Sequence, residues 1–228
     1  MVIAIQDIRK VIESAQKNSK LAAPDAIILG ACKGQGADSI RSAARQGLTH
    51  FGENRVQEAE GKWPELKKEF PDICLHLIGP LQTNKVREAV ALFDVIQTVD
   101  RIKLADSLAQ EGARQGRRVV CYVQVNTGRE PQKAGCAPED VDALVAHCRA
   151  IGLEVQGLMC VPPVGQHGAP HFAWLREKAR ALGLAGLSMG MSEDYETAVR
   201  MGATCVRLGR VLFGEREATP VPTSSAAR

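Results

Sequence analysis

The segment Ala26-Ile27-Ile28-Leu29-Gly30-Ala31-Cys32-Lys33 decides the fold. Its apolar run, bounded by glycine, is typical of a strand that is buried on both faces, as in a parallel sheet. A lysine at the carboxyl end of such a strand projects into the mouth of an α/β barrel or crevice, where these folds place their chemistry. Because burial of an ammonium group is costly, a lysine there tends to act as a neutral, nucleophilic amine. The alternative is a lysine that extends into solvent.

The composition is that of an ordinary globular protein, with 228 residues of which 45% are hydrophobic, 24% charged and 4% aromatic. The net charge of +3 is spread along the chain, and few aromatic side chains are present for base stacking, so a nucleic-acid partner is disfavoured. No secretory signal is evident at the amino terminus, and no apolar run approaches the ~20 residues of a membrane span. We therefore expect a cytoplasmic protein without a membrane partner.

The seven cysteines and five histidines give no ligand pattern. The cysteines form no C-x-x-C pair, and three of them, Cys121, Cys160 and Cys205, lie within strand-like runs. Buried, reduced thiols are the expectation for such residues in a reducing compartment. The histidines are scattered along the chain, so we predict no metal site.

Eight strand-then-helix units follow one another along the chain, after a first helix over 5–20. The expected strands are 26–33, 48–52, 74–78, 95–99, 119–125, 155–159, 186–189 and 204–208. The expected helices that follow them are 37–46, one after Glu53-Asn54-Arg55 that ends at about 68, 82–92, 101–115 with Asp100 as its cap, one from 138, 171–182, one ending at 201 and a short last one. Such a succession predicts parallel pairing with right-handed crossovers.

Eight units of this length fit a single (β/α)₈ TIM barrel. An open, doubly wound sheet is the alternative, because spacing alone does not show closure. The chain has no internal linker or change of composition, so we predict one barrel domain over residues 1–217. Residues 218–228 have the composition of a disordered tail.

Two loops on the carboxyl face of this barrel suit an anion. Ser188-Met189-Gly190-Met191-Ser192 joins the seventh strand to a helix, and Arg207-Leu208-Gly209-Arg210 ends the eighth strand. Loops in these two positions form the commonest phosphate site of TIM barrels. Together with the lysine of the first strand, they indicate a phosphorylated carbonyl compound held as a Schiff base on Lys33. Pyridoxal 5′-phosphate (PLP) fits better than an aldolase's sugar phosphate, since aldolase lysines of this fold usually come from a later strand.

Five segments resemble the signature segments of the pyridoxal phosphate homeostasis proteins, the single-domain, alanine racemase-like family of PLP-binding proteins. The resemblance covers nearly the whole chain, from about Ile28 to Glu215. The segments are FGENRVQE (51–58), HLIGPLQTNK (76–85), GLM (157–159), LSMGMSED (187–194) and VRLGRVLFG (206–214).

The resemblance implies a fold similar to the amino-terminal barrel of alanine racemase, with PLP as the cofactor on Lys33. The residues that it implies at the cofactor are Lys33, Asn54, Ser188, Met191, Ser192, Arg207, Gly209 and Arg210. Among them, Ser192 and the Gly209-Arg210 backbone would hold the phosphate. Arg207 would face the pyridine nitrogen, where its charge disfavours protonation and weakens the ring as an electron sink.

This chain departs from the family pattern at two positions. Cys32 stands where serine usually precedes the lysine, but strand alternation points it away from Lys33, so the Schiff base should survive. Arg55 replaces a common aromatic residue, which leaves the outer wall of the site open.

The sequence favours a carrier over an enzyme. Racemases of this type need a second acid/base from a carboxyl-terminal domain, and this chain ends 18 residues after Arg210. We expect a monomer, without catalytic residues, that buffers PLP and delivers it through transient contacts with PLP-dependent apo-enzymes. The alternatives are a weak racemase or decarboxylase and, less favoured, a Schiff-base aldolase. Lys133 is a candidate for a second PLP-binding amine, although a solvated loop lysine is the more common case.

Overall fold

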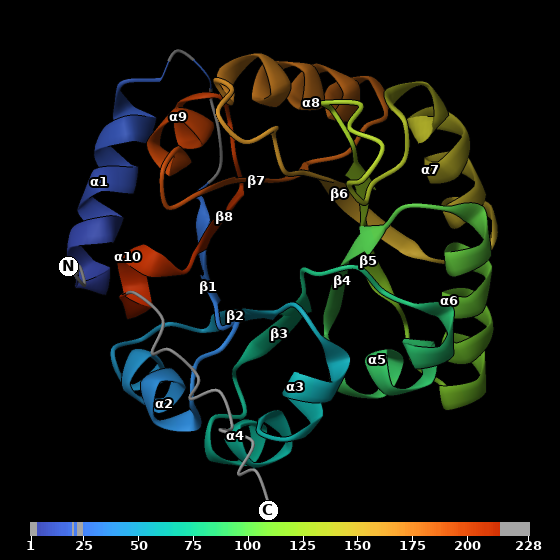
Figure 1. Cartoon of the computed structure of the whole chain (residues 1–228), viewed down its shortest axis with the longest axis horizontal. Helices are drawn as coiled ribbons and strands as arrows, with labels where there is room; N and C mark the ends of the chain where they lie inside the picture. Colours follow the sequence, from blue (N-terminus) through green and yellow to red (C-terminus); the bar gives the residue numbers. More distant parts are fainter. Residues whose placement is uncertain (1–3, 20, 22–24, 215–228) are drawn as a thin grey trace, which may run out of the picture.

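Eight parallel strands form a closed barrel in the computed structural model, which describes residues 4–19, 21 and 25–214 (Figure 1). The strands pair in chain order, and β8 pairs with β1 to close the ring. They are β1 (Ile27–Ala31), β2 (His50–Glu53), β3 (Cys74–Leu77), β4 (Val95–Val99), β5 (Val120–Val125), β6 (Glu154–Cys160), β7 (Gly186–Met191) and β8 (Cys205–Leu208). Closure confirms the TIM barrel and excludes the open sheet. The predicted tail, 218–228, lies outside the described residues.

Helices surround the barrel on its outer side (Figure 1). They are α1 (Ile5–Lys17), α2 (Ala37–Arg45), α3 (Val56–Glu60), α4 (Trp63–Glu69), α5 (Val86–Leu92), α6 (Ile102–Gln115), α7 (Val141–Ala150), α8 (Ala169–Ala181), α9 (Tyr195–Arg200) and α10 (Arg210–Phe213), with short 3₁₀ turns η1 (Thr83–Lys85) and η2 (Pro138–Asp140). In the described part of the chain, none of them has the length and apolarity that a bilayer crossing requires.

Two local predictions are wrong. The single helix expected to end at about Lys68 is two helices, α3 and α4, because Pro64 falls in the first turn of α4 and a proline inside a helix would break it. Asp100 does not cap α6, whose N-cap is Arg101. The Asp100 carboxylate instead forms an ion pair with the Arg101 guanidinium at 2.5 Å.

The main hydrophobic core lies between the barrel and the helices. Alternate strand residues such as Phe51, Leu75 and Ile96 face outward and pack against helix residues such as Ile8 and Trp63, all almost completely buried. Full burial of each such side chain stabilises the fold by roughly 1.5–3 kcal/mol. The outward-facing strand residues therefore hold the helices on the barrel, and the inward-facing residues are left free for other roles.

The barrel interior holds a chain of polar side chains beside a small apolar cluster of Val95, Tyr122 and Met159, whereas bulky branched side chains fill most TIM barrels. Arg207 Nη1 donates to Ser188 Oγ (2.7 Å), and this hydroxyl donates to Gln97 Oε1 (2.6 Å). The Gln97 amide then contacts His76 Nδ1 (2.9 Å), and His76 Nε2 contacts His50 Nδ1 (3.0 Å). Since β4 and β7 are not neighbours, the hydrogen bond between Gln97 and Ser188 crosses the interior.

The donor at one end sets the direction of this interior hydrogen-bond chain. A guanidinium only donates, so Ser188 accepts from Arg207 and passes its own proton toward Gln97. The Gln97 NH₂ group then donates to His76 Nδ1, which leaves the proton of the His76 ring on Nε2, facing His50. Both imidazoles must be neutral for this arrangement to hold.

Burial keeps the two imidazoles neutral. Desolvation lowers the pKa of His76 to about 3, and the charges of His50 and Lys67 act in the same direction. Desolvation also lowers the pKa of His50, which is only half-buried. The interior chain therefore persists at neutral pH.

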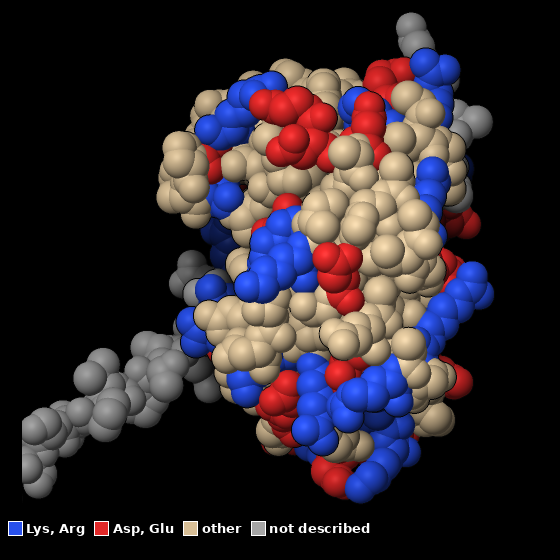
Figure 2. Space-filling model, turned by 90° about the vertical axis from the view of Figure 1, so that its right-hand side faces the viewer, with Lys and Arg blue, Asp and Glu red and all other residues tan. Residues whose placement is uncertain are grey.

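Charges on the outer surface are mixed. Figure 2 shows Lys and Arg side chains beside Asp and Glu on the face that includes α6. Exposed ion pairs such as Arg114–Glu111 (2.6 Å) on α6 and Arg118–Glu154 (2.7 Å) account for part of this pattern. Such pairs contribute little to stability.

His76 makes folding stability depend on pH. Its pKa is lower in the folded protein than in the unfolded chain, so between about pH 6.5 and pH 3 the unfolded chain binds a proton that the folded protein does not. We predict that the free energy of unfolding decreases as the pH is lowered through this window, with His76 contributing up to about 1.4 kcal/mol per pH unit. Urea unfolding at several pH values in EDTA-containing buffer measures this dependence. The His76→Gln variant should show a shallower dependence, and equal slopes would contradict the assignment.

Candidate functional site

A cavity of about 400 Å³ opens at the carboxyl ends of β1, β7 and β8. Seven of the eight residues predicted at the cofactor line it: Lys33, Asn54, Met191, Ser192, Arg207, Gly209 and Arg210. The eighth, Ser188, is completely buried and contacts the cavity residue Arg207 through its hydroxyl. The structure thus brings the predicted residues together at one place, from three separate stretches of the chain and the loop after β2.

Lys33 lies on a turn just above the barrel. β1 ends two residues earlier, at Ala31, and both Ala31 and Lys33 line the cavity. Gly34 follows with φ of 73°, a conformation that favours glycine and turns the chain away toward α2. Lys33 is exposed, so the expectation of a buried ammonium group is wrong. The strand stops too early to carry this side chain into the interior.

Cys32 lies on the opposite side of the segment from Lys33. Its side chain is completely buried in the core between barrel and helices, as strand alternation predicts. Burial raises the pKa of the Cys32 thiol, and the nearby Glu53 carboxylate acts in the same direction. The Cys32 thiol, which lies behind the turn that carries Lys33, is therefore neutral and inert.

Arg207 is a buried cation at the base of the cavity. Only 4% of the residue is exposed. Its guanidinium donates to Ser188 Oγ and to the Cys160 carbonyl oxygen, both at 2.7 Å. In the described part of the chain, no carboxylate lies within ion-pair distance of it. Burial lowers the pKa of Arg207, with opposing contributions that include Asp194 at longer range.

The loops after β7 and β8 form the outer rim. Met191 N donates to Asp194 Oδ1 (2.7 Å) and Asp194 N donates to the Met191 carbonyl (3.0 Å), so the turn that carries Ser192 is closed by two hydrogen bonds. Gly209 is the N-cap of α10, and the first N–H groups of a helix have no partner within it. Glu193 and Arg210 pair across the two loops at 2.6 Å.

Asn54 follows β2 and contributes to a second hollow beside the first. A Cβ atom at Gly79 would lie 2.2 Å from the Asn54 carbonyl oxygen, so glycine at 79 allows the two backbones to approach. The second hollow, of about 420 Å³, shares Lys33 and Asn54 with the cavity and adds Arg55. Arg55 is exposed and lies 3.7 Å from Glu58, which places a charged side chain where the family's aromatic residue would stand.

Sequence reasoning missed several lining residues. Gln35, Ile78, Val161 and Asp194 also line the cavity. Ile78 and Val161 directly follow a strand, as Lys33 and Asn54 were expected to do. The same signal would therefore have identified them.

Two further predictions concern residues outside the cavity. Lys133 does not line it; its ammonium group pairs with Glu130 at 2.6 Å and donates to the Pro162 carbonyl at 3.2 Å. The prediction of no metal site is based on histidines that are scattered in the sequence, but His50 and His76, which are 26 residues apart, meet through strand pairing.

The chain matches known proteins over almost its whole length. The family model for the alanine racemase N-terminal domain matches residues 5–217. A pyridoxal phosphate homeostasis protein of Pseudomonas aeruginosa is 39% identical, covering 93% of this chain and 95% of its own. The human protein of that name is 36% identical, covering 86% of this chain and 78% of its own.

Solved structures agree with this likeness. PipY of Synechococcus elongatus with PLP bound is 36% identical, with a TM-score of 0.77, covering 91% of this chain and all of its own. Alanine racemase of Clostridium difficile is 16% identical with a TM-score of 0.69, covering 95% of this chain and 58% of its own, a likeness of fold alone. The chain therefore belongs to the family of pyridoxal phosphate homeostasis proteins, built on the barrel of the alanine racemase N-terminal domain.

Proposed function

We propose that this chain binds PLP in the cavity at the ends of β1, β7 and β8, and that it stores and delivers the cofactor rather than using it in catalysis. The observation that carries the proposal is the meeting of Lys33, Arg207 and the β7 and β8 loops around one cavity of about 400 Å³. This volume lies in the range typical of small-molecule sites. The PLP-bound structure of PipY, at 36% identity, supports the choice of ligand.

The donors around the cavity suit each part of PLP. The Ser192 hydroxyl and the N–H groups of Gly209 and Arg210 would bind the phosphate, as the first turn of a helix commonly does. Asn54, whose backbone is fixed against Gly79, would contact the cofactor from the β2 side. Lys33 would supply the amine that bonds covalently to the aldehyde carbon. PLP supplies this reactive aldehyde and an electron-withdrawing ring.

Arg207 limits the chemistry that the bound cofactor can support. We assign Arg207 to the pyridine nitrogen, where its fixed positive charge disfavours protonation of that nitrogen. Ser188 and the Cys160 carbonyl hold the guanidinium in place, so it cannot swing away. A ring that stays unprotonated stabilises a carbanion poorly, which favours storage over racemisation.

The lining residues also lack a free second acid or base. Among the described residues around the cavity, the carboxylates are Glu193 and Asp194. Glu193 pairs with Arg210, and Asp194 accepts the Met191 N–H. Neither Tyr122 nor Tyr195 lines the cavity. Two-base proton transfer across a substrate carbon needs a group opposite the lysine, and this arrangement offers none that is unengaged.

Lys33 is the residue to test first. We predict that protein incubated with PLP and reduced with borohydride carries one stable adduct on the peptide that contains Lys33. Peptide mass spectrometry after proteolysis identifies both the residue and the ligand. The Lys33→Ala variant should lose the adduct and the yellow colour, and Lys133→Ala should keep both. An adduct that persists in Lys33→Ala would refute the assignment of the amine.

The carrier role predicts transfer without turnover. PLP-loaded protein, mixed as a monomer with an apo-transaminase, should restore transaminase activity, because the exposed lysine rim lets the cofactor leave. The same protein should racemise alanine no faster than free PLP does. Enzyme-like racemisation, measured by a coupled D-alanine assay, would reject the carrier in favour of a weak enzyme. Binding of a sugar phosphate without PLP would instead favour an aldolase.

A further inference from the structure

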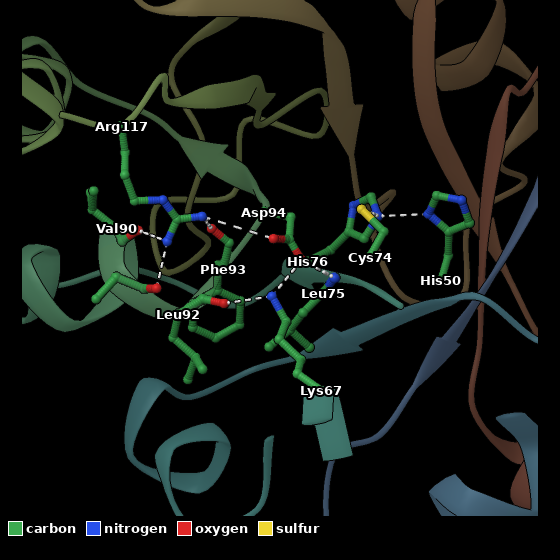
Figure 3. A network of polar contacts seen from close by, with 11 residues as sticks. His50, Lys67, Cys74, Leu75, His76, Val90, Leu92, Phe93, Asp94 and Arg117 are labelled. Carbon is green, nitrogen blue, oxygen red and sulfur yellow. Dashed lines mark hydrogen bonds and ion pairs between the residues drawn. The ribbon is translucent and has the colours of Figure 1, made fainter. Parts of the chain in front are cut away.

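A second group of reactive side chains lies at the opposite end of the barrel from the cavity. His50 is the first residue of β2, and Cys74 is the first residue of β3, with His76 two residues further on. Each offers one ligand atom, and the three atoms lie within 4.8 Å of one another. Figure 3 shows the three side chains directed toward one another. We call these three residues the His–Cys–His cluster.

Strand pairing builds this cluster. Cys74 and His76 are two residues apart on β3, so they project from the same face of the strand. His50 pairs with Cys74 in the register between β2 and β3, which brings its ring beside both. The cluster therefore rests on the backbone of two adjacent strands, a rigid support for a ligand site.

The spacing of the ligand atoms is close to that of a coordination sphere. His50 Nδ1 lies 3.0 Å from His76 Nε2, and Cys74 Sγ lies 3.3 Å from the same nitrogen. Around a tetrahedral zinc ion, with bonds of ~2.0–2.3 Å, neighbouring ligand atoms are about 3.3–3.6 Å apart. These two separations would lengthen by a few tenths of an ångström around the ion, and the third, between His50 Nδ1 and Cys74 Sγ, is within 4.8 Å.

We propose that the His–Cys–His cluster is a binding site for a zinc-class metal ion, with three protein ligands and one open position. Two imidazoles and a thiolate are the ligand set that such borderline and soft ions prefer over Mg²⁺ or Ca²⁺. On binding, the Cys74 thiol releases its proton to solvent and its sulfur bonds to the metal. The His76 proton moves from Nε2 to Nδ1, so that Nε2 can coordinate.

Gln97 is placed to support this change. Its side chain contacts His76 Nδ1 at 2.9 Å, the position from which a second residue usually orients a ligating histidine. Rotation of the Gln97 amide by half a turn would let Oε1 accept the new proton of Nδ1. The NH₂ group would then donate to Ser188 Oγ, which already accepts from Arg207. Metal binding would thus reverse the two hydrogen bonds of Gln97, while Arg207 still donates to Ser188.

His50 also lines a hollow outside the cluster. This hollow, of about 380 Å³, lies between α1 and the amino-terminal ends of β1 and β2. Two carboxylates, Glu13 and Asp25, and one cation, Arg9, line it as well. Lys67 and Asp94 form an ion pair at 2.6 Å near β3 (Figure 3).

The test is metal binding by the full chain after removal of metals with a chelator. Co²⁺ should give a thiolate-to-cobalt charge-transfer band, and Zn²⁺ should displace it. Competition with a chromophoric chelator gives the Zn²⁺ affinity. We expect at least a 100-fold loss of affinity in Cys74→Ser and in His50→Gln. The matched controls Cys148→Ser and His171→Gln, which change residues outside the cluster, should bind as the unsubstituted chain does.

A second measurement needs no variant. Zn²⁺ should slow alkylation of Cys74 in the unsubstituted chain, as followed by peptide mass spectrometry, while alkylation of Cys148 stays unchanged. Absence of the cobalt band, a band that survives in Cys74→Ser, or alkylation of Cys74 that ignores Zn²⁺ would overturn the proposal. None of these readouts depends on PLP, so the experiments test the metal site independently of the cofactor site.

Discussion

The buried guanidinium of Arg207 is the constraint on which the rest of the site depends. A cation held inside a barrel without a carboxylate partner is costly unless neutral groups satisfy its N–H bonds. Ser188 and the Cys160 carbonyl do so, and Gln97 and His76 extend the arrangement across the interior. The polar side chains inside the barrel therefore stabilise one charged group, the Arg207 guanidinium. This group faces the cavity where the ligand is proposed to bind.

Barrel geometry separates the tasks of the two ends. At the carboxyl end, an exposed lysine and the loops after β7 and β8 surround an open cavity, which suits a ligand that must leave again. At the amino end, the side chains of His50 and His76 lie inside the barrel, and burial keeps both imidazoles neutral. The interior hydrogen-bond chain joins the two ends of the barrel. A change in proton positions at one end therefore affects the hydrogen bonds at the other.

The sequence predicts the barrel well because each unit carries its own local signal. The strand over 95–99 has the predicted bounds, and seven of the eight site residues follow from their position at strand ends or in the family's motifs. The interior chain could not be predicted, because Gln97, Ser188 and His76 meet only after the barrel closes. The exposure of Lys33 could not be predicted either, because it depends on the residue at which β1 ends. The sequence signal for the break between α3 and α4 is Pro64, which lies in the first turn of α4.

We propose that Arg207 keeps the ring nitrogen of bound PLP unprotonated and so favours storage of the cofactor over catalysis. The ¹⁵N NMR shift of PLP, labelled at that nitrogen and bound to the chain at neutral pH, tests this proposal. We expect the shift of an unprotonated pyridine, and a move toward that of a pyridinium when Arg207 is replaced by glutamate. A pyridinium shift in the unsubstituted protein would contradict the proposal.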